Sequence, residues 1–189
     1  MRLVILVSAA VLAFAAAGCG GGGDSSSSGT KPATWATDVC GALLTWQKDL
    51  TSGSQQLSSD LPTSKDAKSA KRRVVVFLQA AQQSTAKMVS EVRSAGAPAV
   101  KDGPALQNDL ETGLSQASAS FQRAVTQAKK LPTTNPQTLA AGMSGLAQTI
   151  RTELTAAGNH FSSLDTKYDT TELKQAMADE PSCKPFLSR

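Results

Sequence analysis

The sequence predicts an all-α fold: an antiparallel, up-down-up-down four-helix bundle with a short C-terminal helical tail stapled by a disulfide. Apolar residues recur at spacings of three and four over four segments of about 25–32 residues, which is typical of amphipathic helices. Short joints that contain Pro, Gly or Asn separate these segments, as expected for antiparallel neighbours. No segment alternates apolar and polar residues with a period of two, so we expect no strand.

The first helix is expected from about Thr34 to Asp60-Leu61-Pro62. Its stripe has a weak position around Gly53, where we expect fraying or a kink. The two tryptophans share one face, and we expect core packing in preference to ligand stacking. The apolar stripe consists of Trp35, Val39, Leu43, Trp46, Leu50, Leu57 and Leu61.

The second helix is expected from about Ser64 to Ala95. Gly96 provides a stop at its end, and Pro98 prevents the helix from resuming. The predicted core stripe consists of Ala67, Ala70, Val74, Phe77, Ala81, Met88, Val92 and Ala95.

The third helix is expected to begin at Gly103-Pro104, because proline suits the first turn, and to end before Pro132. Its stripe consists of Leu106, Leu110, Leu114, Ala117, Phe121, Ala124, Ala128 and Leu131. Many stripe positions in the chain are alanines, which bury little area each, so we expect thin packing.

The fourth helix should open at Asn135-Pro136, an N-cap followed by proline. Its stripe consists of Leu139, Met143, Leu146, Ile150, Leu154, Ala157, Phe161 and Leu164. A short fifth helix is expected in the tail, capped by Asp169 with Glu172 reaching back, and with Leu173 and Met177 facing inward. Pro181, Cys183 and Pro185 should then end ordered helix.

The N-terminus carries an export and lipidation signal. After Arg2, an apolar run from Leu3 to Ala17 is shorter than the roughly 20 residues that span a bilayer, which favours a signal peptide over a permanent anchor. It ends at Ala16-Ala17-Gly18-Cys19, a pattern like a bacterial lipobox. We therefore expect a signal peptide over 1–18 and acylation of Cys19.

The Gly/Ser-rich stretch that follows favours a membrane tether over an ordinary secretory signal. We expect this tether, with the lipidated cysteine, to cover 19–33 and the helical domain to cover 34–189. The lipid anchor would hold the protein on the extracytoplasmic face of the cell membrane.

Two cysteines remain when Cys19 is acylated. An exported chain meets an oxidising environment, so Cys40 and Cys183 are most simply a disulfide, with two free buried thiols as the alternative. In an up-down-up-down bundle, the start of the first helix and the end of the fourth lie at the same end. The pairing of Cys40 with Cys183 is therefore compatible with the bundle.

Catalytic constellations are missing from the sequence. The only histidine, His160, has Ser163 as the one possible nucleophile within a helical turn, and an ordinary partly exposed histidine explains it better. A haem site that uses His160 with Met88 or Met143 is conceivable, but methionine is a common core residue. We expect no enzyme activity, no cofactor and no metal site.

The net charge of +4 is too small to indicate a nucleic-acid partner. The predicted topology nevertheless gathers basic residues at the end of the bundle remote from the tether, against only Asp60 and Asp66. This basic cap would face anionic cell-wall polymer or an acidic envelope protein, although a solvated set of helix ends also explains it. The cap consists of Lys65, Lys68, Lys71, Arg72, Arg73, Lys129 and Lys130.

A resemblance to a known group rests on few positions. The lipobox and Gly/Ser tract, the run Thr34-Trp35-Ala36-Thr37-Asp38-Val39-Cys40, Trp46, and Cys183 with Leu187 resemble small lipoproteins of high-GC Gram-positive bacteria, especially actinobacteria. The resemblance implies an envelope location but no activity and no functional residues. We expect a non-enzymatic accessory or binding module, with a carrier of a small apolar ligand or cofactor as the alternative.

Overall fold

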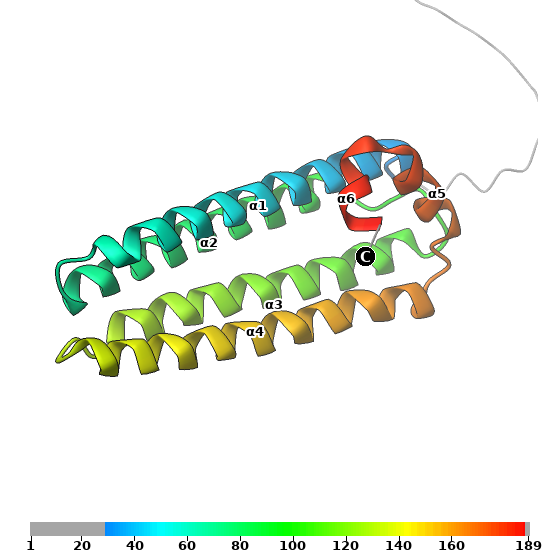
Figure 1. Cartoon of the computed structure of the whole chain (residues 1–189). Coiled ribbons are helices and arrows are strands. Elements are labelled where there is room, and N and C mark those ends of the chain that lie inside the picture. Colours follow the sequence, from blue (N-terminus) through cyan, green and yellow to red (C-terminus); the bar gives the residue numbers. More distant parts are fainter. Residues whose placement is uncertain (1–28, 188–189) are drawn as a thin grey trace, which may run out of the picture.

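The computed structural model describes residues 29–187, and this part of the chain is helical throughout, as predicted (Figure 1). The predicted signal peptide and Cys19 lie outside the described residues. The elements are α1 (Pro32–Asp60), η1 (Leu61–Thr63), α2 (Ala67–Ala95), α3 (Gly103–Lys130), α4 (Pro136–Lys167), α5 (Thr171–Asp179), η2 (Pro181–Cys183) and α6 (Lys184–Leu187).

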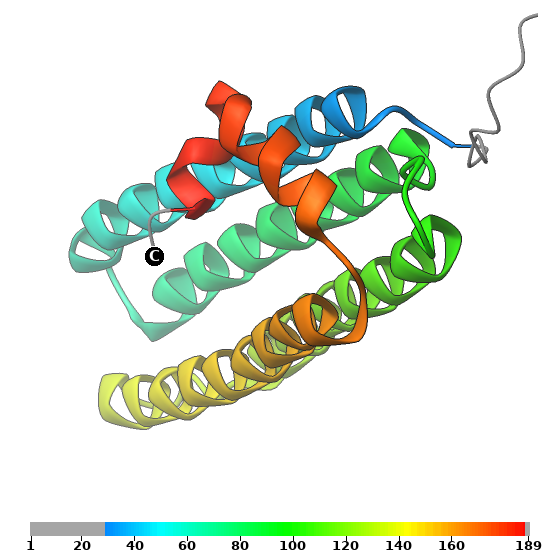
Figure 2. The same cartoon turned by 90° about the vertical axis from the view of Figure 1, so that its right-hand side faces the viewer.

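The four long helices lie side by side, and the chain reverses direction between them (Figures 1 and 2). The α1–α2 and α3–α4 connections lie at one end, which we call the distal end. The start of α1, the α2–α3 connection and the C-terminal segment lie at the other, the proximal end (Figure 1).

Each long helix packs mainly against its neighbours in the sequence: α1 on α2, α2 on α3 and α3 on α4. The other main partners of α1 are α5 and η2, and no extensive contact joins α1 to α4 within the described residues. In α4 only four side chains are buried, although it is the longest helix; they are Leu139, Leu146, Ala157 and Leu164. The predicted apolar stripe of α4 is therefore only partly buried by the neighbouring helices.

Three helix boundaries illustrate the local rules. The Asn135 side chain accepts a hydrogen bond from the Thr138 amide at 2.8 Å, which confirms the predicted cap of α4. Gly96 has a φ of +71° and ends α2 as predicted. The start of α2 was predicted too early: Asp66 accepts from the Ser69 amide at 2.6 Å and caps a helix that begins at Ala67, not near Ser64.

The end of the predicted tether is bound to the domain. The Thr30 amide donates to the Ala97 carbonyl oxygen at 2.8 Å, and the Ala99 amide donates to the Thr30 carbonyl oxygen at 2.7 Å. Gly29 lies so close to this loop that a Cβ on it would be 2.6 Å from the Ala97 oxygen. Helix α1 then begins at Pro32, two residues before the expected start near Thr34.

The tail forms two short helical elements more than the single helix expected, the 3-10 turn η2 and the helix α6. Helix α5 is present, with Leu173 buried and the Asp169 carboxylate accepting from the Thr171 amide at 3.2 Å. The prolines do not end the helical structure, because Pro181 and Pro185 lie in the first turns of η2 and α6, where no amide donor is needed.

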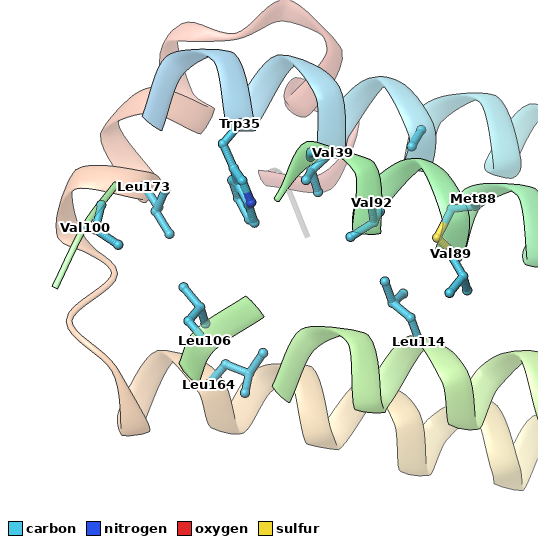
Figure 3. Close-up of a cluster of buried hydrophobic side chains, with 12 residues drawn as sticks. Trp35, Val39, Met88, Val89, Val92, Val100, Leu106, Leu114, Leu164 and Leu173 are labelled. Carbon is cyan, nitrogen blue, oxygen red and sulfur yellow. The ribbon is translucent and has the colours of Figure 1, made fainter. Parts of the chain in front are cut away.

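The core divides into a proximal and a distal cluster. The proximal cluster centres on Trp35, which points from α1 toward Leu106 and Leu164 (Figure 3). The distal cluster is smaller; it consists of Val74, Leu78, Ala124, Val125, Ala128 and Leu146. Phe77 was predicted in this core, but it is only half-buried, and Leu78, at 2% exposed, takes the core position.

Both tryptophans are anchored inside the domain by hydrogen bonds, which agrees with the predicted packing role. The Trp35 indole donates to the Gln107 side-chain oxygen at 3.3 Å, and the Gln107 amide donates to the Val92 carbonyl oxygen. The Trp46 indole donates to the Thr85 hydroxyl at 2.9 Å. These bonds satisfy the polar groups that would otherwise be costly to bury.

Candidate functional site

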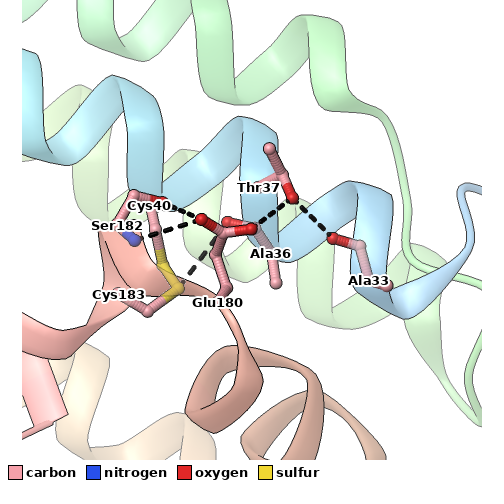
Figure 4. The surroundings of a disulfide bond; sticks show 7 residues. All are labelled: Ala33, Ala36, Thr37, Cys40, Glu180, Ser182 and Cys183. Atoms are coloured by element: carbon pink, nitrogen blue, oxygen red, sulfur yellow. Dashed lines mark hydrogen bonds between the residues drawn. A yellow bond between two sulfur atoms is a disulfide. The ribbon is translucent and has the colours of Figure 1, made fainter.

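The predicted disulfide between Cys40 and Cys183 is present, and its two Cα atoms are 5.0 Å apart (Figure 4). Both residues are 0% exposed and form a small cluster with Ala36 against the tail. Because the sulfurs are buried, the bond serves to join α1 to the tail and is not an accessible reactive group.

Glu180 reinforces this junction (Figure 4). Its carboxylate accepts from the Thr37 hydroxyl at 2.6 Å and from the Ser182 amide at 3.1 Å. The Thr37 bond, and then the bonds from Ser182, hold the pKa of Glu180 below its ordinary value.

His160 and Ser163 do not form a catalytic pair. The ring Nε2 lies 2.9 Å from the Asp109 carbonyl oxygen and acts as its donor, because a carbonyl oxygen only accepts. The Ser163 hydroxyl donates instead to the His160 carbonyl oxygen at 2.6 Å. Met88 and Met143, the other candidates for a haem site, belong to different core clusters.

The side chain of Asp109 ties α3 to the end of α4. One carboxylate oxygen accepts from the Lys167 ammonium at 2.5 Å and from the Tyr168 hydroxyl at 2.8 Å. The Lys167 bond, followed by the Tyr168 bond, lowers the pKa of Asp109. Both hydrogen bonds go to the same carboxylate oxygen of Asp109. They connect α3 to the end of α4, which is a structural role.

Residues 29–187 contain no group of three or more His, Cys, Asp or Glu side chains that could hold a metal ion. The same part of the chain contains no helix that is both long and apolar enough to cross a bilayer.

The basic cap is assembled from two separate segments at the distal end. Lys71, in the first turns of α2, donates through its ammonium to the Leu131 carbonyl oxygen at the end of α3 at 2.8 Å. This contact places Lys71 at Leu131, the residue that follows Lys129 and Lys130 in the last turn of α3.

Most charges of the cap are not neutralised by ion pairs. Within residues 29–187, Arg73 alone of the seven forms a salt bridge, to Asp60 at 3.0 Å. Asp66 caps α2, and the Ser69 amide and hydroxyl, with smaller effects of Arg72 and Lys68, lower the pKa of its carboxyl. The cap therefore keeps a net positive charge at neutral pH.

A surface hollow of about 680 Å³ lies next to the cap, between the last turns of α1 and the first half of α2. Its wall is mainly apolar, and its lining also includes three members of the cap: Lys65, Arg72 and Arg73. Sequence reasoning missed this hollow. The signal for it was Val76, an apolar residue outside the predicted stripe, which is 60% exposed.

The chain was compared with protein-family models, curated proteins and solved structures, and none of them matches it.

Proposed function

We propose that this chain is a membrane-anchored lipoprotein of the extracytoplasmic face. In this proposal its four long helices act as one antiparallel, up-down-up-down bundle that carries a binding surface and performs no catalysis. The lipidated Cys19 and the tether hold the proximal end near the membrane. The basic cap at the distal end binds anionic polymer of the cell wall.

The observation that supports the proposal is the hydrogen bond from Lys71 to the Leu131 carbonyl oxygen, which brings one basic residue of α2 to the end of α3 that carries Lys129 and Lys130. The start of α1 lies at the opposite end of the helices (Figure 1). Helix α3 has 28 residues, and at about 1.5 Å per residue it separates the two ends by about 42 Å. A tether attached at the proximal end would therefore present the cap away from the lipid.

Helix stability does not explain all of these cations. Lys129 and Lys130 lie at a helix C-terminus, where positive charge is favourable, but Lys68, Lys71 and Arg72 lie near the N-terminus of α2. Of these, Lys68 lies in the first turn, where a cation opposes the helix dipole by about 0.3–1 kcal/mol. A cluster maintained against this cost is consistent with a polyanionic partner, whose binding would weaken as salt screens the charges.

The test is sedimentation of the protein with purified cell walls. The protein is residues 19–189 with Cys19→Ser, which retain every residue that the structure describes. At low salt we expect the wild-type surface to sediment with the walls. The combined change Lys68→Glu, Arg72→Glu and Lys130→Glu should abolish this binding, and added salt should weaken binding of the unaltered surface.

A matched control has the same change in net charge at exposed positions outside the cap: Lys48→Glu, Lys101→Glu and Arg151→Glu. If both triple variants lose binding equally, net charge and not the cap is responsible. Retention that is indifferent to the cap changes and to salt would refute the proposal.

A second candidate function is the carrying of a small ligand with an apolar part. The specific observation in its favour is the apolar hollow between α1 and α2, which has the size of a typical small-molecule site. The hollow lies on the surface of the helices, not at the centre of the four-helix arrangement where a carried ligand was expected.

A further inference from the structure

We infer that the hollow between α1 and α2 binds an amphiphile with a single acyl chain and an anionic head group. The inference rests on the carrier function proposed above, and it does not depend on whether the cap binds wall polymer. Three features of the hollow support it: an apolar wall, a glycine that lets an aromatic ring approach closely, and a cationic rim.

The apolar wall is formed by side chains that the core does not use. Val76 is 60% exposed and Ala80 is exposed, and both line the hollow with Leu57 and Phe77. In the described part of the chain, only Val76 and Leu187 are exposed among the large apolar side chains, and Val76 is the more exposed. Apolar side chains gathered around a concavity mark a binding site for an apolar group more often than isolated ones do.

Gly53 lets the Phe77 ring, which lines the hollow, approach the α1 backbone closely. A Cβ on this residue would lie 3.2 Å from two carbons of the Phe77 ring, which is tighter than ordinary contact. The ring therefore packs directly over the α1 backbone. A larger side chain at position 53 would push the ring into the space that the acyl chain needs.

The rim supplies the charge for the head group. The charged residues of the lining are Lys65, Arg72 and Arg73 against the single acid Asp60. Asp60 is engaged by Arg73 at 3.0 Å, so Lys65 and Arg72 are left without an ion pair in the described residues. A guanidinium and an ammonium at the edge of an apolar wall match an anionic head joined to an acyl chain.

A wall polymer fits this surface less well. Sugar or glycerol phosphate repeats are polar along their whole length and would leave Val76 and Phe77 uncovered. A neutral apolar ligand would leave the two cations unused. Only a ligand with both parts uses the wall and the rim together.

The test is isothermal titration calorimetry with 1-lauroyl lysophosphatidylglycerol below its micelle concentration. The protein is again residues 19–189 with Cys19→Ser. We expect saturable binding of one molecule, and weaker binding by about tenfold or more for lauroyl lysophosphatidylcholine, whose head carries no net charge. Glycerol phosphate alone should show no binding that depends on the hollow.

Two variants separate the wall from the rim. Val76→Asp with Ala80→Phe should weaken lysophosphatidylglycerol binding about tenfold or more, because one change charges the wall and the other fills it. Both positions are exposed, so we expect the variant to fold, and circular dichroism checks this. Lys65→Gln with Arg72→Gln should abolish the preference for the anionic head and spare the binding of lysophosphatidylcholine.

The matched control is Lys129→Gln with Lys130→Gln, which removes the same charge from the cap outside the hollow. This control should retain lysolipid binding. The Val76→Asp, Ala80→Phe variant of the hollow should still sediment with cell walls. Lysolipid binding that survives a folded wall variant would overturn the inference, as would equal binding of both lysolipids or of glycerol phosphate alone. Reduced sedimentation with cell walls in the Lys129→Gln, Lys130→Gln variant, with intact lysolipid binding, would separate the two proposals.

Discussion

Removal of the disulfide should destabilise the domain, and the structure gives the size of the effect. The bond joins residues separated by 143 positions, so it closes nearly the whole described chain into one loop. The chain-entropy model assigns a loop of this length about 5 kcal/mol of stabilisation at 25 °C, although measured values are often smaller. For a domain of this size, that corresponds to a fall in Tm of about 10–20 °C.

Part of the loss of stability can take the form of local opening of the tail, without unfolding of the whole domain. The tail packs chiefly on α1, through α5 and η2, and its buried contribution to the proximal cluster is Leu173. Without the covalent bond, the tail can separate from α1 before the long helices unfold. We therefore expect amides of α5 to lose hydrogen-exchange protection to a greater extent than amides of α2 and α3.

The assay compares the Cys19→Ser protein with the variant that also carries Cys40→Ala and Cys183→Ala, by thermal denaturation and hydrogen exchange. The double change avoids a free thiol. A Tm within about 2 °C of the parent, with α5 equally protected, would refute the stabilising role of the disulfide.

Three further predictions concern the anchor, a buried hydroxyl and a partly exposed carboxylate. A fatty-acid analogue should label the full-length protein but not Cys19→Ala, and equal labelling would contradict lipidation. Thr85→Val should lower the free energy of unfolding in urea by about 1–3 kcal/mol, because the Trp46 indole loses its acceptor; an unchanged value would contradict this role. Because partners lower the pKa of Asp109, its stabilising effect is present at neutral pH and lost as pH falls through the folded-state pKa. Asp109→Asn should therefore lower Tm at pH 7 but not at pH 2, and an equal loss at both would show that charge is unimportant.

Several local features of the fold could be predicted because short-range chemistry decides them. Asn135 caps α4 through its side-chain oxygen, and Gly96 ends α2 because a residue without a Cβ readily adopts a positive φ. The error at the start of α2 has the same origin, since Ser64 and Asp66 are both good caps and only the structure shows that Asp66 is used.

The core position in α2 could not be decided from spacing. The run from Val74 to Phe77 and Leu78 is apolar at every position, and steps of three and of four from Val74 both follow a helix face. The direction of the neighbouring helices selects Leu78 for the core. Phe77 is thereby left to the edge of the distal cluster, where it lines the hollow.

The cap and the hollow differ in how far sequence reasoning could reach them. The cap depends on which helix ends lie together, and the expected order of the helices was the basis for predicting that grouping. The hollow depends on how closely α1 approaches α2 at one point, which a periodic pattern does not specify. It therefore appeared only in the structure.

Gly53 is a residue whose place in a helix is explained by a packing contact and not by helix propensity. Its weak helix propensity predicted fraying or a kink, yet α1 runs without interruption from Pro32 to Asp60. A glycine within a helix costs about 1 kcal/mol relative to alanine, so helix formation does not account for it. Contact with the Phe77 ring does, because a side chain at position 53 would press on that ring. The same ring is the aromatic side chain that the core left out. Gly53 in α1 and Phe77 in α2 thus contact each other, and this contact forms part of the wall of the hollow beside the basic cap.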